Sequence, residues 1–238
     1  SIVLENFLTS YQTRLEEINI LKDQENYRRE FLGNVSHELK TPLFTIQGYI
    51  LTLIEGALKD KKVRGKYLRR SAKGVDRLIS IVKDLDLITQ FESGIKTVDK
   101  TDFNIYELIE NVYDLMEFES EKNNTKLLVY NENNTPVIVN ADKERILQVL
   151  TNLVVNSIKY GKEGGYTKVK VEEYDKDRII VRVKDNGEGI EDEHLPRLFE
   201  RFYRIDKNRS RKKGGSGLGL SIVKHIICLL YTSDAADE

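Results

Sequence analysis

In the stretch Ser36-His37-Glu38-Leu39-Lys40-Thr41-Pro42, one histidine lies outside the hydrophobic pattern of a long helix. The surrounding apolar residues recur at alternating steps of three and four, a spacing typical of a helix packed in a bundle; they are Leu32, Val35, Leu39, Ile46, Tyr49 and Leu53. If Leu32 is position a of a heptad, His37 is position f, which faces away from the partner helices. The pattern predicts an imidazole exposed to water, and such a ring is largely neutral and nucleophilic at pH 7.

Two residues near this histidine could influence its reactivity. Glu38 can hydrogen-bond one ring nitrogen of His37 and fix its tautomer. Pro42 lies inside the helical pattern, where it removes the backbone bond to the carbonyl of Glu38 and should bend or loosen this turn. A lone exposed histidine is usually an ordinary surface residue, but these neighbours favour a functional one.

The longer stretch from Phe31 to Leu43 resembles the phosphoacceptor box of sensor histidine kinases. In that family the histidine takes the γ-phosphoryl group of ATP and passes it to an aspartate of a response regulator, so the resemblance implies this role for His37. The residues from Glu38 to Thr41 also resemble the phosphatase motif of the family. Thr41 would then hold a water in line with the phosphorus of the regulator's phospho-aspartate; the alternative is a structural threonine at a helix bend.

Composition limits the other possibilities. The chain has 238 residues, 39% hydrophobic and 32% charged, and its net charge of −1 gives no reason to expect nucleic acid. One cysteine excludes an internal disulfide and fits a reducing compartment. No stretch approaches the roughly 18 consecutive apolar residues of a membrane span. The missing initiator methionine suggests a fragment, and the resemblance implies the cytoplasmic portion of a membrane-anchored bacterial protein whose sensor and membrane segments lie upstream.

The first part of the chain is predicted to be helical. Residues 1–24 form either a short interaction helix or a signalling coiled coil that continues into the His37 helix, and the absence of Gly and Pro before residue 33 favours the second. A helical hairpin over 25–94 turns near Gly56. Its apolar face is wider than two helices can bury, which predicts a homodimeric four-helix bundle rather than packing on the chain's own second domain.

Mixed helix and strand patterns follow a linker at residues 95–100. Helices are predicted over 104–121 and 142–160, and strands over 126–130, 137–139, 169–171 and 179–183. This order predicts an α+β sandwich over 101–238, with helices on one face of a sheet.

The helix over 142–160 carries polar residues on one face. Asn152, Asn156 and Lys159 are spaced by four and three residues. They are either buried polar groups of the core or a site in which the Asn156 carbonyl oxygen binds Mg²⁺ and Lys159 binds phosphate. With Gln148 and Tyr160 they resemble the N box of the kinase ATP-binding domain.

Two further segments resemble nucleotide-binding boxes of the same family. Taken alone, the stretch from Asp185 to Ile190 has the residue types of an ordinary turn. Beside the Asn152 helix it resembles the first glycine box, in which the Asp185 carboxylate binds the adenine amino group and Gly187 and Gly189 admit the ring. The stretch from Phe199 to Arg204 reads either as core aromatics on a short helix or as the F box that anchors the nucleotide lid.

A basic loop follows, with Lys207, Arg209, Arg211, Lys212 and Lys213. It leads into a glycine-rich stretch before an apolar helix, where backbone N–H groups and the helix dipole can receive phosphate oxygens. The stretch has neither a P-loop nor a Rossmann context and resembles the second glycine box, with Gly215, Gly217, Leu218 and Gly219 as binding residues.

Together with the patterns above, the resemblance implies a homodimeric histidine kinase core that uses ATP and Mg²⁺ and docks a response regulator receiver domain. Glu38 would orient or deprotonate His37. The resemblance runs from about residue 25 to 227, and residues 228–238 resemble no part of the family. Two alternatives remain open, namely a related ATPase that does not phosphorylate itself and a non-catalytic dimerisation scaffold.

Overall fold

The computed structural model describes the chain except for residues 1, 93–97, 132–134, 176–177, 206–214 and 238, and except for the side chains of 2–10, 91–92 and 232–237. The chain divides into two compact units, residues 1–82 and 83–238. None of the described helices is long and apolar enough to cross a membrane.

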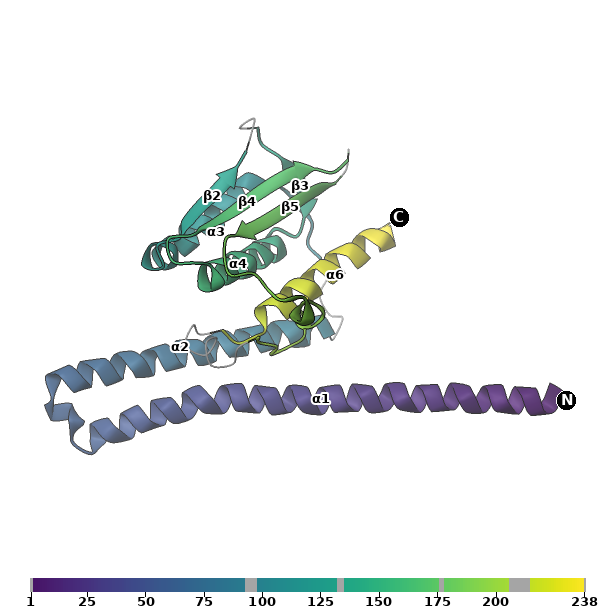
Figure 1. Cartoon of the computed structure of the whole chain (residues 1–238), viewed down its shortest axis with the longest axis horizontal. Helices are drawn as coiled ribbons and strands as arrows, with labels where there is room; N and C mark the ends of the chain where they lie inside the picture. The colour runs from purple at the N-terminus through teal and green to yellow at the C-terminus, as the bar shows by residue number, and fades with distance from the viewer. Residues whose placement is uncertain (1, 93–97, 132–134, 176–177, 206–214, 238) are drawn as a thin grey trace. The chain divides into compact units, whose positions relative to one another are not determined.

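The first unit is a helical hairpin (Figure 1). Helix α1 runs from Ile2 to Ile54 without a break, a short 3-10 helix spans Ala57–Lys59, and α2 begins at Lys61 and continues to Glu92 in the second unit. Gly56 makes the turn with a φ of 132°, a conformation that favours glycine. Asp60 caps α2 because its Oδ1 accepts hydrogen bonds from the backbone N–H groups of Lys62 and Val63, at 2.8 and 3.2 Å.

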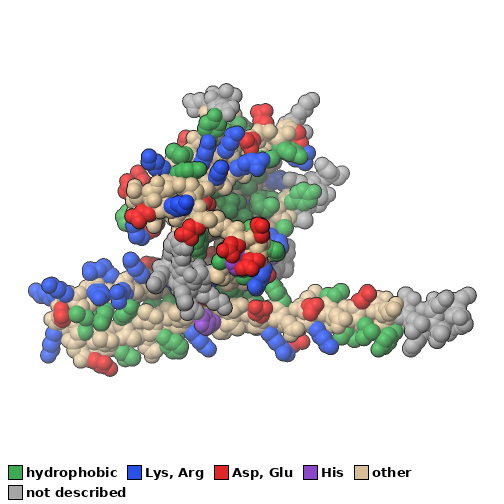
Figure 2. Space-filling model, in the orientation of Figure 1, with side chains coloured by type: hydrophobic (Ala, Val, Ile, Leu, Met, Phe, Trp, Pro, Cys, Tyr) green, Lys and Arg blue, Asp and Glu red, His purple; other side chains and the backbone are tan. Residues whose placement is uncertain are grey.

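The two helices of the hairpin approach closely at Gly74. A Cβ built there would lie 2.7 Å from Cγ1 of Ile46, so a larger residue would push the helices apart. Leu53 and Ile81 are buried. Other apolar side chains stay exposed on the single chain, between charged ones (Figure 2); they include Leu43, Phe44, Ile50, Leu51, Leu68, Val75, Ile79 and Val82.

The second unit is an α/β domain, as predicted. Strand β2 (Lys126–Tyr130) pairs parallel with β4 (Tyr166–Glu173), which pairs antiparallel with β5 (Ile179–Asp185). Strand β1 (Thr101–Asn104) pairs antiparallel with β3 (Ile138–Ala141). Polar Thr101 and Asp102 gave no strand signal, so β1 was not predicted; it forms because β3 supplies its hydrogen bonds.

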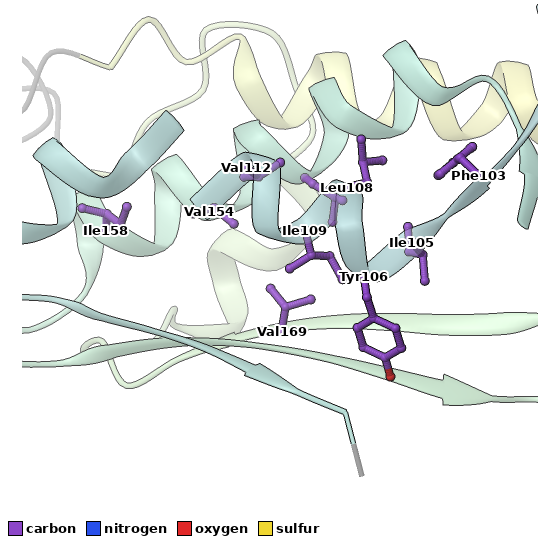
Figure 3. Close-up of a cluster of buried hydrophobic side chains, with 10 residues drawn as sticks. Phe103, Ile105, Tyr106, Leu108, Ile109, Val112, Val154, Ile158 and Val169 are labelled. Carbon is purple, nitrogen blue, oxygen red and sulfur yellow. The ribbon is translucent and has the colours of Figure 1, made fainter. Parts of the chain in front are cut away.

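Helices α3 (Ile105–Lys122) and α4 (Lys143–Tyr160) pack on the three-stranded sheet. Figure 3 shows Val169 of the sheet beneath Ile109 of α3, with Val154 of α4 nearby. The core consists of buried apolar residues from both helices and the sheet: Phe103, Ile105, Tyr106, Leu108, Ile109, Val112, Leu150, Val154, Ile158 and Val169. Alternation along β4 buries Thr167 and Val169 against the helices.

A second core joins α4 to helix α6 (Gly219–Asp237) and to the end of α2. Buried Ile88 of α2 packs with residues from both helices, namely Val149, Leu218, Ile222, Val223 and Ile226. The 3-10 helix η2 (Asp192–Arg197) precedes a turn. The stretch from Phe199 to Arg204 forms turns and irregular backbone rather than the short helix considered in the sequence analysis. Phe202 has a φ of 63°, which a right-handed helix does not allow.

Candidate functional site

His37 lies on α1 with its side chain 59% exposed, which agrees with position f of the predicted heptad. The side chain of Glu38, the next residue, is only 11% exposed and contacts Arg77 of α2. Thr41 follows one turn after His37 and is exposed. Its hydroxyl donates a hydrogen bond of 3.1 Å to the carbonyl oxygen of His37, so the hydroxyl oxygen remains an acceptor for a water.

Glu38 lies between two cationic or potentially cationic groups. Its Oε2 accepts a hydrogen bond of 2.9 Å from Nη2 of Arg77 on α2, and its Oε1 is 3.9 Å from Nδ1 of His37. The sequence placed Glu38 beside the imidazole but gave no sign of Arg77. Arg77 lies three residues after Gly74, on the helix face that meets α1, and only a heptad register for both helices would have pointed to it.

The second group of predicted residues is carried by α4. Asp142 caps this helix by accepting a hydrogen bond of 3.1 Å from the backbone N–H of Arg145. Asn152, Asn156 and Lys159 are half-buried on its surface. The opposite face carries Ser157, whose hydroxyl lies 2.6 Å from that of Thr167 in the buried interior.

The first glycine box lies against the C-terminal end of α4. Oδ1 of Asp185 accepts a hydrogen bond of 2.7 Å from the N–H of Gly187. A Cβ built on Gly187 would lie 2.7 Å from that Oδ1 and 3.0 Å from the carbonyl oxygen of Tyr160. A larger residue would displace the Asp185 carboxylate and crowd the end of α4, so glycine lets this turn lie close to the helix. Gly189 has a φ of 81°, which also favours glycine.

The second glycine box meets the same helix. A Cβ built on Gly215 would lie 3.0 Å from the hydroxyl oxygen of Tyr160, and one built on Gly219 would lie 3.4 Å from Oδ1 of Asn152. Gly217 has a φ of 79°, and its carbonyl accepts a hydrogen bond of 2.9 Å from the N–H of Phe202. The structure therefore brings both glycine boxes to α4 and joins the second one to the F box.

The remaining predicted residues are less closely tied to this group. Phe199 is 44% exposed and Arg204 is half-buried. Leu218 is fully buried under the start of α6. The basic residues of the loop, from Lys207 to Lys213, lie outside the described residues.

Asp84 near the end of α2 is a neighbour of this group that the sequence did not reveal. Its Oδ2 accepts a hydrogen bond of 3.2 Å from the hydroxyl of Ser216 in the second glycine box. Burial raises the pKa of Asp84 from 3.8 to about 6, although the Ser216 hydrogen bond and the charge of Lys159 both act to lower it. Asp84 and Ser216 are 132 residues apart, so no local signal could have linked them.

Comparison with known proteins gives two family matches. The His Kinase A (phospho-acceptor) domain matches residues 27–94, and the histidine kinase-, DNA gyrase B- and HSP90-like ATPase family matches 141–234. Among solved structures, a histidine kinase AdeS of Acinetobacter baumannii has a TM-score of 0.63 at 28% identity, covering 82% of this chain and 87% of its own. A histidine kinase ThkA in complex with the response regulator protein TrrA also has a TM-score of 0.63, at 30% identity, covering 77% and 53%.

Two curated relatives match most of the chain. The sensor histidine kinase WalK of Bacillus subtilis is 36% identical over 206 residues, which are 86% of this chain and 33% of that protein. The sensor protein kinase WalK of Staphylococcus aureus is 34% identical over 224 residues, 93% of this chain and 53% of that protein. The chain thus spans between a third and about half of the length of these relatives. The phosphoacceptor match, the ATPase match and these relatives together show that the chain belongs to the sensor histidine kinase family.

Proposed function

We propose that this chain transfers the γ-phosphoryl group of ATP to His37 and passes it to an aspartate of a response regulator. The observation that carries the proposal is the exposed His37 beside the inward-facing Glu38, within the segment that the phospho-acceptor family matches. An exposed imidazole can reach a nucleotide and then a partner protein. Glu38 orients the ring or accepts its proton during transfer.

The residues around α4 suit an adenine nucleotide. Glycines 187 and 215 leave space beside Asp185 and Tyr160 that a Cβ would fill, so a flat ring and phosphate oxygens can approach the backbone. The Asp185 carboxylate is an acceptor for the adenine amino group, with Gly189 in the same turn. Lys159 supplies a positive charge for phosphate, and the first turn of α6, at Gly219, supplies backbone N–H groups.

The remaining predicted residues have supporting roles in this proposal. Asn152 faces Gly219, and Gly217 and Leu218 shape the start of α6. Phe199 and Arg204 begin the lid segment. Asn156 offers an amide oxygen, a ligand type that Mg²⁺ accepts, and a bound Mg²⁺ would neutralise phosphate charge.

Two partners follow from the same proposal. The exposed apolar side chains of the hairpin support a homodimer in which two hairpins form a four-helix bundle, because a single chain leaves them in water. The solved complex of ThkA with a response regulator supports a receiver domain as the second partner. Docked to receive phosphate from His37, that domain would place its phospho-aspartate near Thr41, whose hydroxyl would hold the hydrolytic water.

By its similarity to the WalK sensor kinases, the chain acts on the cytoplasmic side of a membrane to which its protein is anchored. With a net charge of −1, the chain has no excess of basic residues that would favour nucleic acid as a partner.

Incubation with γ-labelled ATP tests the proposal. A histidine kinase retains a label that is stable in alkali and lost in acid, whereas an ATPase of the related group releases labelled phosphate only, and a dimerisation scaffold does neither. His37→Gln should abolish labelling while nucleotide binding and the oligomeric state stay as in the unsubstituted chain. Retention of the label by His37→Gln would reject His37 as the acceptor.

A further inference from the structure

The contact between α1 and α2 beside His37 has a specific geometry. Nη2 of Arg77 lies 2.9 Å from Oε2 of Glu38, and the side chains are 22% and 11% exposed. The other carboxylate oxygen, Oε1, is on the His37 side, 3.9 Å from Nδ1. The two oxygens of one carboxylate therefore face different partners.

The backbone of α2 favours this contact. Gly74 lies one turn before Arg77, and a Cβ built there would be 3.8 Å from the carbonyl oxygen of Pro42 and 2.7 Å from Cγ1 of Ile46. The absence of a side chain at Gly74 lets the two helices approach, and this approach brings the guanidinium within reach of Glu38. The position of the carboxylate thus depends on a residue that lies 39 positions further along the chain.

A carboxylate in this position needs a fixed partner. Burial of a charged group is costly unless the group is paired and hydrogen-bonded. The planar guanidinium presents its donors in a rigid fork, so it restricts the torsions of a glutamate side chain more than a hydrated lysine would. Held at Oε2, Glu38 keeps Oε1 aimed at the imidazole.

We propose that Arg77 is a positioning residue for phosphoryl transfer to His37, an inference that rests on the proposed function. Arg77 fixes the Glu38 carboxylate so that Nδ1 of His37 keeps its proton and donates it toward Oε1. The lone pair is then on Nε2, the ring nitrogen on the far side from Glu38. A small rotation of either side chain closes the 3.9 Å separation to a hydrogen bond.

The transfer step balances with these groups. The Nε2 lone pair forms the N–P bond, the bond from the γ-phosphorus to its bridging oxygen breaks, and ADP leaves with that electron pair. The ring gains a positive charge, which the Glu38 carboxylate compensates through the Nδ1 proton. In this role Arg77 acts on the reacting nitrogen only through Glu38, so its removal should lower kcat and leave KM for ATP unchanged.

Three variants and one control test this role. Arg77→Met keeps the apolar stem and removes the charge. Arg77→Lys keeps the positive charge but lacks the planar guanidinium, and Glu38→Gln removes the carboxylate that Arg77 would orient. Arg70→Met is the matched control because Arg70 also reaches from α2 to α1, where it donates a hydrogen bond of 3.3 Å to the Tyr49 hydroxyl.

The first readout is the rate of His37 labelling at saturating and limiting ATP. Arg77→Met should lose about tenfold in kcat, by analogy with the lower end of the 10- to 100-fold loss that follows removal of a hydrogen-bond partner orienting a metal ligand. Arg77→Lys should recover part of this loss, and Arg70→Met should stay within about twofold. The Arg77→Met/Glu38→Gln double variant should be no slower than Glu38→Gln, because Arg77 acts through Glu38.

The second readout needs no ATP. Nitrogen-15 spectra of the histidine rings at pH 8, assigned with His37→Gln, report which nitrogen of His37 carries the proton. The Nδ1–H form should predominate in the unsubstituted chain and Arg70→Met, and Arg77→Met should move toward the mixture of free histidine.

Two results would overturn the inference. One is an Arg77→Met variant whose His37 tautomer and kcat are both unchanged. The other is a double variant that is slower than Glu38→Gln by the same factor that Arg77→Met loses alone. If the unsubstituted chain takes up no label, the proposed function fails, while the tautomer measurement still decides the role of Arg77.

Discussion

Replacing Asp84 with Asn should stabilise the second unit at neutral pH. The carboxylate of Asp84 is partly buried, and this burial raises its pKa from 3.8 to about 6. The folded state therefore holds a proton more tightly than the unfolded state does. This contribution to stability is fully present below pH 3.8 and is lost as pH rises through about 6, so at pH 7.5 the ionised group destabilises the fold.

The size of the effect follows from the shift. About two pKa units correspond to about 3 kcal/mol as an upper limit. Since the group is not completely removed from water, we expect Asp84→Asn to gain about 1–2 kcal/mol. The amide oxygen of asparagine can still accept the hydrogen bond from Ser216, so the substitution removes the charge and keeps the contact.

Hydrogen exchange of α6 measures this gain. The buried amides around Ile222 and Ile226 exchange only when the core that contains Ile88 opens. A gain of 1–2 kcal/mol should slow their exchange by about 5- to 30-fold relative to the unsubstituted chain at pH 7.5. At pH 5 the gain in free energy should fall to about half, which corresponds to exchange only about 2- to 5-fold slower, because Asp84 is then mostly protonated in the folded state.

Asp86→Asn is the matched control, because Asp86 is exposed on the same helix. It should leave exchange unchanged at both pH values. Equal exchange in Asp84→Asn and the unsubstituted chain at pH 7.5 would refute the reasoning, as would a difference that does not depend on pH. Either result would mean that the Asp84 carboxylate is hydrated in solution rather than held against Ser216.

Three further outcomes are expected. Thr41→Ala should abolish dephosphorylation of the phosphorylated receiver domain, measured as released phosphate, while labelling of His37 continues; equal dephosphorylation would leave Thr41 a structural role only. Asp185→Asn should weaken ATP binding in titration calorimetry by at least about tenfold, because an amide can present its donor to adenine; an unchanged Kd would remove Asp185 from the site. Ser157→Ala should lower the free energy of unfolding in urea by about 1–2 kcal/mol, because the buried Thr167 hydroxyl loses its partner. Adding Thr167→Val should restore much of this loss, and a double variant whose loss equals the sum of the single losses would contradict the pairing.

Much of the fold could be read from local patterns. Strand β2 has the predicted bounds, and α3 and α4 differ from the prediction by one residue at their ends, because helix periodicity and the caps Asn104 and Asp142 are local signals. Strand β1 was missed because it consists of four residues, two of them polar and exposed. Its pairing with β3 is a tertiary contact that no pattern within residues 101–104 encodes.

The sequence by itself determined which residue types the candidate site contains. Exposure of His37 follows from heptad position, and the need for glycine at Gly187 and Gly217 follows from turn and phosphate-loop chemistry, all within a few residues of chain. Only the tertiary structure decided which distant side chains meet these segments. Arg77 reaches Glu38 because Gly74 lets two helices approach, and Asp84 meets Ser216 because Ile88 packs in the core of α6. Such contacts depend on packing between elements, which periodicity within one element cannot specify.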